Sequence, residues 1–229
     1  MVKPTSTNYL VNFTGTIKEG EREVLLDGAR KTSTMTYDAP GCQIYEIYQS
    51  RDPDRSRTIL VFIEWQDEKF FKQNILSQEK REMYNRYHIH VERNSIHGTR
   101  WSKWMAPNPF LSLEMQIMNP EPLAPSQGAF YPYFAFSLMA MAKPSRYCEY
   151  QAYLARTQAL ALQIGSGVIR YDIYDGVSDD NQGVTLVFGV FKTEHEMLYH
   201  LAQDFSPLSP TVIDMLHAAP HLAKWQREI

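Results

Sequence analysis

The chain has 229 residues, of which 44% are hydrophobic, so it is long enough to bury the core of one large domain or two small ones. Its formal net charge of -3 provides no basic surface for a phosphate backbone, which excludes nucleic acid as an expected partner. No apolar run has the length of a membrane span, and the first residues lack the apolar stretch of a signal peptide. We therefore expect a soluble, cytoplasmic protein with no membrane partner.

The first part of the chain predicts the order strand, helix, strand, strand, helix. Residues 8–17 form an apolar, β-rich run, and residues 19–34 have the pattern of a helix. Two β-rich runs within residues 41–65 flank the polar turn SRDPDRSR, which predicts a hairpin. The acidic Asp67 and Glu68, directly after Gln66, mark the start of another helix. After a further short helical stretch, the segment RWSKW, residues 100–104, is predicted as a closing strand.

A proline-rich segment then separates this part from a second one with similar organisation. We predict a first half over residues 1–106, a connector over residues 107–128 and a second half over residues 129–229. The second half repeats the order of elements. They are a strand at 130–141, a helix at 145–164, a hairpin at 167–191, a helix from 193 and a closing strand at 221–225.

The two halves share a sequence repeat with a spacing of 126 residues. The segment from Gly41 to Phe71 aligns without a gap to the segment that begins at Gly167, and a Leu-Val-Phe triplet and a pair of tyrosines keep one register. Each half has the βαββαβ order of a ferredoxin-like unit, whose sheet has one face under helices and one bare apolar face. The predicted fold class is therefore α+β, with two tandem ferredoxin-like halves whose antiparallel sheets pack into one α+β barrel.

Residues 8–80 carry several motifs in a fixed order. Gly41-Cys42 leads into a Tyr-Glu-Ile-Tyr strand, an Asp-Pro-Asp turn follows, and a strand that ends in Glu64-Trp65 precedes an acidic helix with Ser77 beyond it. This set resembles the antibiotic biosynthesis monooxygenase family, here as a tandem-repeat member, and residues 130–204 match it weakly. The resemblance implies the dimeric α+β barrel fold. It leaves the reaction open, because that superfamily includes cofactor-free monooxygenases of aromatic polyketides, heme-degrading enzymes, lactone isomerases and polyketide cyclases.

The resemblance also implies a pocket in the first half that contains Asn12 and Trp65. Some family members place Asn and Trp on these strands, facing the cleft between sheet and helices. There an amide could bind a phenol or enolate oxygen, and an indole could confine a flat ring. The alternatives are core packing for Trp65 and an exposed strand edge for Asn12. Phe191 replaces Trp65 in the second half, so the two halves cannot have equivalent sites.

Histidine shows the opposite distribution between the halves. Family members often carry a His nine residues after the Trp, a position that is Asn74 in the first half and His200 in the second. The resemblance therefore gives no support for a heme site in the first half. His200 lies in an otherwise apolar stretch and is predicted either as a general base with a pKa suited to neutral pH or as a structural histidine.

The run RYHIHVERN contains His88, His90 and Glu92. On a strand all three would share one face and could bind a metal, whereas on a helix the two histidines would point apart. We predict no metal and favour a loop in which His88 or His90 is an acid–base group at a pocket mouth. Cys42 and Cys148 form neither a disulfide framework nor a zinc spacing, and both are predicted as buried thiols.

Aromatic residues are numerous, with 14 Tyr, 11 Phe and 4 Trp, which indicates either an aromatic core or a pocket for a flat apolar ligand. Tyr45 and Tyr171 share one face of their strands, and Tyr48 and Tyr174 share the other. One pair is expected near the clefts and the other in the core between the sheets. These four tyrosines and Phe191 are the predicted substrate-binding residues.

The sequence contains no G-x-G-x-x-G after a strand and no P-loop, and we predict no bound cofactor. The predicted function is a cofactor-independent enzyme of secondary metabolism that acts on a hydrophobic, aromatic or polyketide-derived substrate, with O2 as second substrate of a monooxygenase reaction. A redox-neutral cyclase or isomerase and a non-catalytic binding protein are the alternatives. Because two sheets in one chain can close a barrel alone, we expect a monomer, or a homodimer formed through helices.

Overall fold

The computed structural model describes residues 8–103, 132–164 and 167–229. They fall into two units. The N-terminal unit holds residues 8–103, 176–182 and 223–229, and the C-terminal unit holds residues 132–164, 167–175 and 183–222. The predicted connector, residues 107–128, lies outside the described residues.

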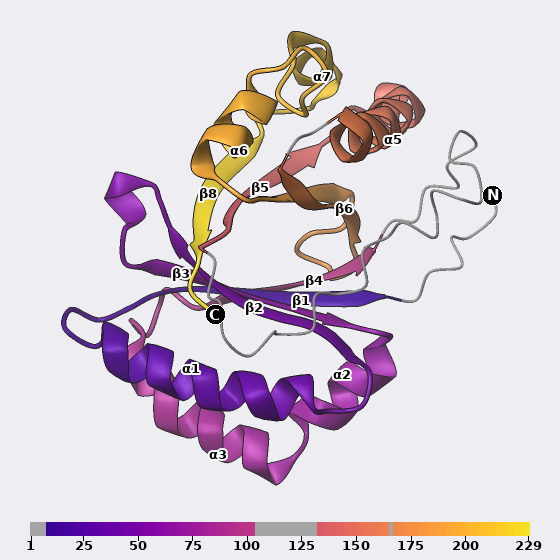
Figure 1. Ribbon diagram of the computed structural model, residues 1–229. Coiled ribbons are helices and arrows are strands. Elements are labelled where there is room, and N and C mark those ends of the chain that lie inside the picture. Colours follow the sequence, from indigo (N-terminus) through magenta and orange to yellow (C-terminus); the bar gives the residue numbers. More distant parts are fainter. Residues whose placement is uncertain (1–7, 104–131, 165–166) are drawn as a thin grey trace. The chain divides into compact units, whose positions relative to one another are not determined.

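The N-terminal unit is an antiparallel sheet with helices on one face (Figure 1). Its strands are hydrogen-bonded in the order β4-β1-β3-β2-β8. Its elements are β1 (Tyr9–Thr16), α1 (Arg22–Tyr37), β2 (Cys42–Ser50), β3 (Thr58–Trp65), α2 (Glu68–Ile75), α3 (Gln78–Tyr87), β4 (His97–Lys103) and the larger part of β8 (His221–Arg227). The predicted strands and hairpin are confirmed, and α1 begins three residues later than predicted because Gly20 has a positive φ of 78°.

The second helical region of this unit is divided into two helices. Asp67 is the N-cap of α2, and its side chain accepts a hydrogen bond from the Phe70 backbone N–H at 3.1 Å. Ser77 is the N-cap of α3 and accepts from the Lys80 N–H at 3.3 Å. The chain therefore turns at Leu76, and the first turn of α3 begins beside the end of α2.

The C-terminal unit repeats the order strand, helix, hairpin and helix, but the strand predicted to close the second half, β8, pairs instead with β2 of the N-terminal unit. Its strands pair in the order β5-β7-β6, and its helices pack on one face of them. Its elements are β5 (Phe134–Met141), α5 (Tyr147–Ile164), β6 (Val168–Gly176), β7 (Val184–Phe191), α6 (Glu194–Leu201) and α7 (Pro210–Met215). The predicted hairpin and helices are confirmed, and both units belong to the predicted α+β class. No helix in the described part of the chain is long and apolar enough to cross a membrane.

The sequence repeat corresponds to equal strand pairing in the two units. Cys42 pairs with Trp65, and Val168 pairs with Phe191, with a register shift directly after Cys42 and after Val168. The glycine before each of these strands has a positive φ, 80° at Gly41 and 84° at Gly167. Residues with a Cβ rarely adopt this conformation, so the glycine that opens each copy has a local backbone reason.

The cores of the two units differ. In the C-terminal unit, buried side chains from the strands and from α5, α6 and α7 form one continuous cluster. In the N-terminal unit, the buried residues fall into separate clusters, and Val61 and Ile63, which lie between them, are only partly buried. The packing between sheet and helices is therefore less complete in the N-terminal unit.

Candidate functional site

A cleft of about 330 Å³ lies among the helices of the N-terminal unit. Pockets for small molecules begin at about 300 Å³, so the cleft is large enough for a compact ligand. Its lining comes from the end of α1 and the residues after it, from α2 and from the start of α3. The lining residues are Met35, Ala39, Pro40, Phe70, Gln73, Asn74, Ser77, Glu79 and Lys80. We call this space the N-terminal cleft.

The apolar wall of the N-terminal cleft continues into a buried aromatic cluster. Ala39 and Phe70 line the cleft and also pack against the cluster of Tyr9, Val11 and Trp65. Trp65 is 1% exposed, and its ring centroid lies 6.4 Å from that of Phe71, within the range of favourable aromatic contact. Its indole Nε1 has no hydrogen-bond acceptor among the described residues. Trp65 thus packs against two residues of the cleft wall but is not itself one of the lining residues.

The polar wall of the N-terminal cleft contains Asn74 and Lys80. Lys80 Nζ donates to the Thr32 carbonyl at 3.3 Å and to Thr36 Oγ1. Burial lowers the pKa of Lys80, against the opposing effects of Cys42 and Glu79. Nothing in the sequence of α3 singles out Lys80, because QEKREMYNRY has the charged pattern of a solvent-exposed helix.

The two cysteines differ in their surroundings. Cys42 is half-buried, and burial raises the pKa of its thiol to about 11 although the charge of Lys80 opposes this shift. It is therefore a neutral thiol near pH 7 and a poor nucleophile. Cys148 is exposed, so the prediction that both thiols are buried is wrong for this residue.

The corresponding position in the C-terminal unit is filled by aromatic rings around His200. This residue, on α6, is 5% exposed and lies within 6.0 Å, centroid to centroid, of four rings. These rings belong to Phe136, Tyr171, Phe191 and Phe205. The structure thus brings together three predicted site residues, His200, Tyr171 and Phe191, but in a packed core.

The ring cage also changes the acid–base properties of His200. Burial lowers the pKa of His200 to about 4, and burial raises the pKa of Tyr171 well above its usual value. The 3.4 Å contact between His200 Nε2 and the Tyr171 hydroxyl therefore joins two neutral groups near pH 7. Of the two alternatives predicted for His200, the structural histidine fits this environment better than the general base, because burial among four aromatic rings disfavours the charged imidazolium.

Asn12 and Trp65 do not form one site. Asn12 Oδ1 accepts hydrogen bonds from Trp101 Nε1 at 3.0 Å and from Thr99 Oγ1. Val11, next to Asn12 on β1, belongs to the Trp65 cluster on the helix side of the sheet. Because neighbouring residues of a strand point to opposite faces, Asn12 points away from the helices and from the N-terminal cleft.

His88 and His90 lie in a short 3₁₀ helix (His88–His90), so the strand that an H-x-H-x-E metal site requires is absent from this segment. His88 stacks on Tyr84 at 5.3 Å, and His90 Nδ1 lies 3.0 Å from Glu21 Oε2. Glu92 pairs with Arg57 at 3.1 Å. Neither histidine lines the N-terminal cleft. In the described ranges, no three His, Cys, Asp or Glu residues are grouped as a metal site.

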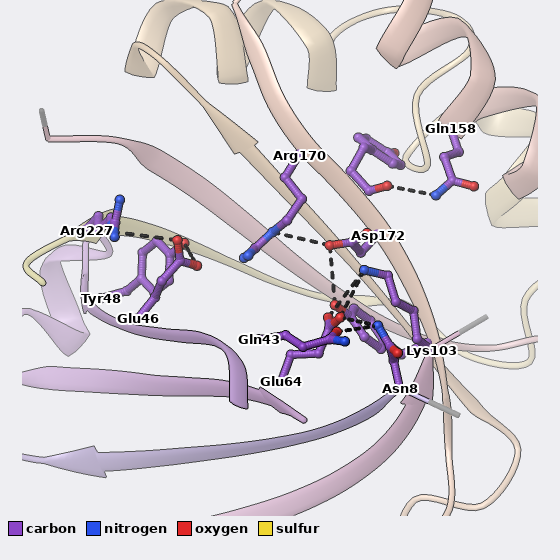
Figure 2. Close-up of polar contacts among 12 residues, drawn as sticks. Asn8, Gln43, Glu46, Tyr48, Glu64, Lys103, Gln158, Arg170, Asp172 and Arg227 are labelled. Carbon is purple, nitrogen blue, oxygen red and sulfur yellow. Dashed lines mark hydrogen bonds and ion pairs between the residues drawn. The ribbon is translucent and has the colours of Figure 1, made fainter. Parts of the chain in front are cut away.

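The four tyrosines divide between the faces as the alternation predicts. Tyr45 and Tyr171 pack on the helix side. Tyr48 and Tyr174 lie on the other face. The Tyr48 phenol donates to Glu46, two residues earlier, at 2.7 Å (Figure 2). The Tyr174 phenol donates to Asp172, also two residues earlier, at 3.3 Å. Each of these two phenols therefore forms a hydrogen bond within its own unit. None of the four lines the N-terminal cleft.

The same face of the N-terminal sheet contains a buried charge that the sequence did not single out. Glu64 is 1% exposed, and its carboxylate accepts from Asn8 Nδ2 at 2.7 Å and from Lys103 Nζ at 3.2 Å (Figure 2). Asn8 also donates to Gln43 at 2.7 Å. A buried carboxylate needs such partners, and this cluster lies on the face away from the cleft.

No protein-family model matches the chain, and no curated protein matches it in sequence. Solved structures do resemble it. One is a candidate monooxygenase from Fusobacterium nucleatum subsp. nucleatum, with a TM-score of 0.74 and 13% identity over 98% of this chain and 94% of that chain. Another is an anthrone oxidase-like protein, with a TM-score of 0.59 and 12% identity over 98% and 93% of the two chains.

A mutant chlorite dismutase from Candidatus Nitrospira defluvii is also similar, with a TM-score of 0.61 and 9% identity over 97% of this chain and 92% of that chain. At such identities the likeness concerns the fold and not the reaction. The chain therefore has the α+β fold that these monooxygenase-like proteins and the chlorite dismutase share.

Proposed function

We propose that the protein is a monooxygenase-type enzyme of secondary metabolism that oxidises an aromatic, polyketide-derived molecule in the N-terminal cleft without a bound metal or flavin. The observation that carries this proposal is the difference between the two units. A cleft of about 330 Å³ lies beside α2, whereas rings fill the space around His200 on α6. The N-terminal unit thus has space for a substrate beside α2, whereas side chains fill the corresponding position of the C-terminal unit.

The names of similar structures support the oxygenase reaction over its alternatives. One is a candidate monooxygenase and one is anthrone oxidase-like, and each aligns over almost all of this chain. An anthrone is a flat aromatic ketone, and the apolar wall of Ala39 and Phe70 suits such a ring. The chlorite dismutase with the same fold shows why this support is an analogy and needs an activity test.

The proposed reaction needs an acidic CH2 group next to aromatic rings. Loss of one proton gives a delocalised carbanion, which reduces O2 and combines with it to form a peroxide anion. A proton returned from solvent converts this anion into a hydroperoxide. The hydroperoxide then loses water and leaves a carbonyl group, so one O2 gives one C=O and one H2O. In this scheme the cleft excludes water from the carbanion, and the Asn74 amide donates a hydrogen bond to a substrate oxygen.

A non-catalytic binding protein is the second candidate, and one observation favours it. His88 and His90 do not line the N-terminal cleft, and His200 is enclosed by rings with its pKa lowered to about 4. None of the predicted histidines therefore stands at the cleft as a base. In the oxygenase reading the substrate loses its proton to solvent before it enters the cleft, and the cleft binds the resulting anion.

Oxygen uptake by the metal-stripped protein with emodin anthrone tests the proposal. We expect enzyme-dependent uptake in the wild type and a loss of about tenfold or more in Asn74→Trp, because an indole at this position fills the cleft. Lys72→Trp is the matched control, since Lys72 lies on the same helix but outside the cleft lining. It should stay within about twofold of the wild type.

Each result has a defined meaning. Wild-type uptake no faster than the spontaneous rate would reject an anthrone oxygenase and favour a redox-neutral cyclase, an isomerase or a binding protein. Uptake that is equal in Asn74→Trp and Lys72→Trp would place the reaction outside the N-terminal cleft.

We further infer that the chain consists of tandem ferredoxin-like halves, over residues 1–106 and 129–229, whose sheets pack into one barrel. The shared strand register, the shared register shift and the left-handed Gly41 and Gly167 support this tandem organisation. A chain that closes its own barrel should sediment as a monomer of 26.6 kDa. An obligate dimer that unfolds on dilution would contradict self-closure, whereas a dissociable dimer with folded monomers would indicate association through the helices.

A further inference from the structure

Lys80 has an unusual position for a lysine on a charged surface helix. It lies in the first turn of α3, is partly buried and lines the N-terminal cleft together with the apolar Met35, Ala39 and Phe70. The stem of a lysine can pack on apolar groups while its ammonium reaches a polar site. Lys80 therefore contributes a cationic side chain to the lining of the cleft.

The hydrogen bonds of Lys80 leave part of its capacity unused. An ammonium has three donors, and the described residues supply two acceptors, the Thr32 carbonyl and Thr36 Oγ1. The Thr36 hydroxyl in turn donates to Thr32 at 2.7 Å, so its oxygen is oriented to accept from Lys80. Thr36 is 2% exposed, which fixes this arrangement within the unit. The third donor has no acceptor among the described residues.

The charge of Lys80 also lacks a counterion. Within the described ranges, no carboxylate forms an ion pair with Lys80 Nζ, and the exposed Glu79 at the cleft rim acts on the pKa of Lys80 through its charge without such a contact. Cys42 supplies no anion, because burial raises the pKa of its thiol to about 11. Burial likewise lowers the pKa of Lys80, the direction expected for a cation with too little solvation. A bound anion would correct this deficit.

We propose that Lys80 makes the N-terminal cleft a site for aromatic anions, with the ring against Ala39 and Phe70 and an acidic oxygen on Lys80 Nζ. This rests on the proposed function and deepens it, since it names the substrate class. A phenolate, an enolate or a carboxylate shares the required chemistry. The enolate of an anthrone belongs to this class, and Lys80 would hold the substrate in its deprotonated, O2-reactive form.

Two fluorescent probes that differ by one charged group test the proposal. 8-Anilinonaphthalene-1-sulfonate carries a sulfonate, and N-phenyl-1-naphthylamine has the same rings without it. Lys80→Met removes the charge but keeps an apolar stem, Lys80→Arg keeps the charge, and Lys72→Met is the control on the neighbouring helix. Asn74→Trp, which fills the cleft, reports whether a probe binds there at all.

We expect Lys80→Met to weaken sulfonate binding about tenfold, equivalent to about 1.4 kcal/mol, and to leave the neutral probe within about twofold. Lys80→Arg should retain most of the sulfonate affinity, and Lys72→Met should change neither probe. Equal weakening of both probes by Lys80→Met would overturn the proposal, as would no effect on either. Sulfonate binding that Asn74→Trp does not reduce would overturn it as well, because the probe would then lie elsewhere.

The anion-binding test and the oxygenase test can each fail without the other. Charge-selective binding without anthrone oxidation would retain the anion site and reject the oxygenase. Oxidation that depends on Asn74 but tolerates Lys80→Met, with no preference for the sulfonate probe, would retain the oxygenase and reject the anion site.

Discussion

Trp65→Ala should lower the free energy of unfolding by about 3–5 kcal/mol, the usual cost of removing a large buried ring. Trp65 is 1% exposed and packs with Tyr9 and Val11 on the helix side of the sheet. Its neighbour Phe71 would lose an aromatic contact at 6.4 Å. Because the surrounding residues are held by strand pairing on both sides of Trp65, the cavity can collapse only partly. Urea unfolding followed by far-UV circular dichroism measures this change.

Trp65→Phe should cost only about 1–2 kcal/mol, since a phenyl ring fills most of the same space. Phe191 occupies the corresponding position of the C-terminal unit and pairs with the corresponding strand residue. The substitution also removes an indole Nε1 that has no acceptor among the described residues, so no hydrogen bond found there is lost. A cost equal to that of Trp65→Ala would mean that Nε1 is hydrogen-bonded in solution.

His200→Leu should remove a pH dependence of about 2.5 kcal/mol from the free energy of unfolding between pH 7.0 and pH 4.5. Burial lowers the pKa of His200 in the folded protein to about 4, whereas the imidazole in an unfolded chain has a pKa near 6.5. Above pH 6.5 the residue is neutral in both states. As the pH falls toward 4, the unfolded chain gains a proton that the folded protein does not, so the wild type loses stability.

Urea unfolding at pH 7.0 and pH 4.5 measures this effect as the difference between wild type and variant. His217→Leu is the control, because His217 is an exposed histidine of the same unit and should leave the pH dependence unchanged. If the wild type and His200→Leu lose stability equally on acidification, the imidazole is accessible to protons in the folded state, and the ring cage is looser than the four contacts indicate.

Local signals explain why the strands and hairpins could be predicted. Each of these signals constrains the backbone of a few neighbouring residues: the β-rich runs, the polar turns, and the glycines at 41 and 167. The repeat also predicts the same arrangement in both halves. The start of α1 differs from the prediction for a local reason. Glu19 suits the first turn of a helix, but the positive φ of Gly20 is not helical, so the helix begins at Arg22.

The cleft could not be predicted because it depends on contacts between segments far apart in the sequence. Met35, Phe70 and Lys80 come from three helical regions, and the packing of α1 and α2 against α3 brings them together. The proposed pairing of Asn12 with Trp65 failed for a related reason. Each residue was assigned to a strand correctly, but which residues of different strands share a face depends on the register, Tyr9 with Trp65 and Asn12 with Phe62.

The divided core of the N-terminal unit has a consequence for how a ligand and the fold would depend on each other. No residue of α2 is fully buried, whereas α6 buries Met197 and His200. A molecule bound in the cleft would supply apolar contacts that α2 lacks. It would thereby increase the buried apolar area between α2 and the rest of the N-terminal unit. Occupancy and local folding would then be thermodynamically linked, so that every increase in free ligand raises the cost of detaching α2 and α3 from the sheet.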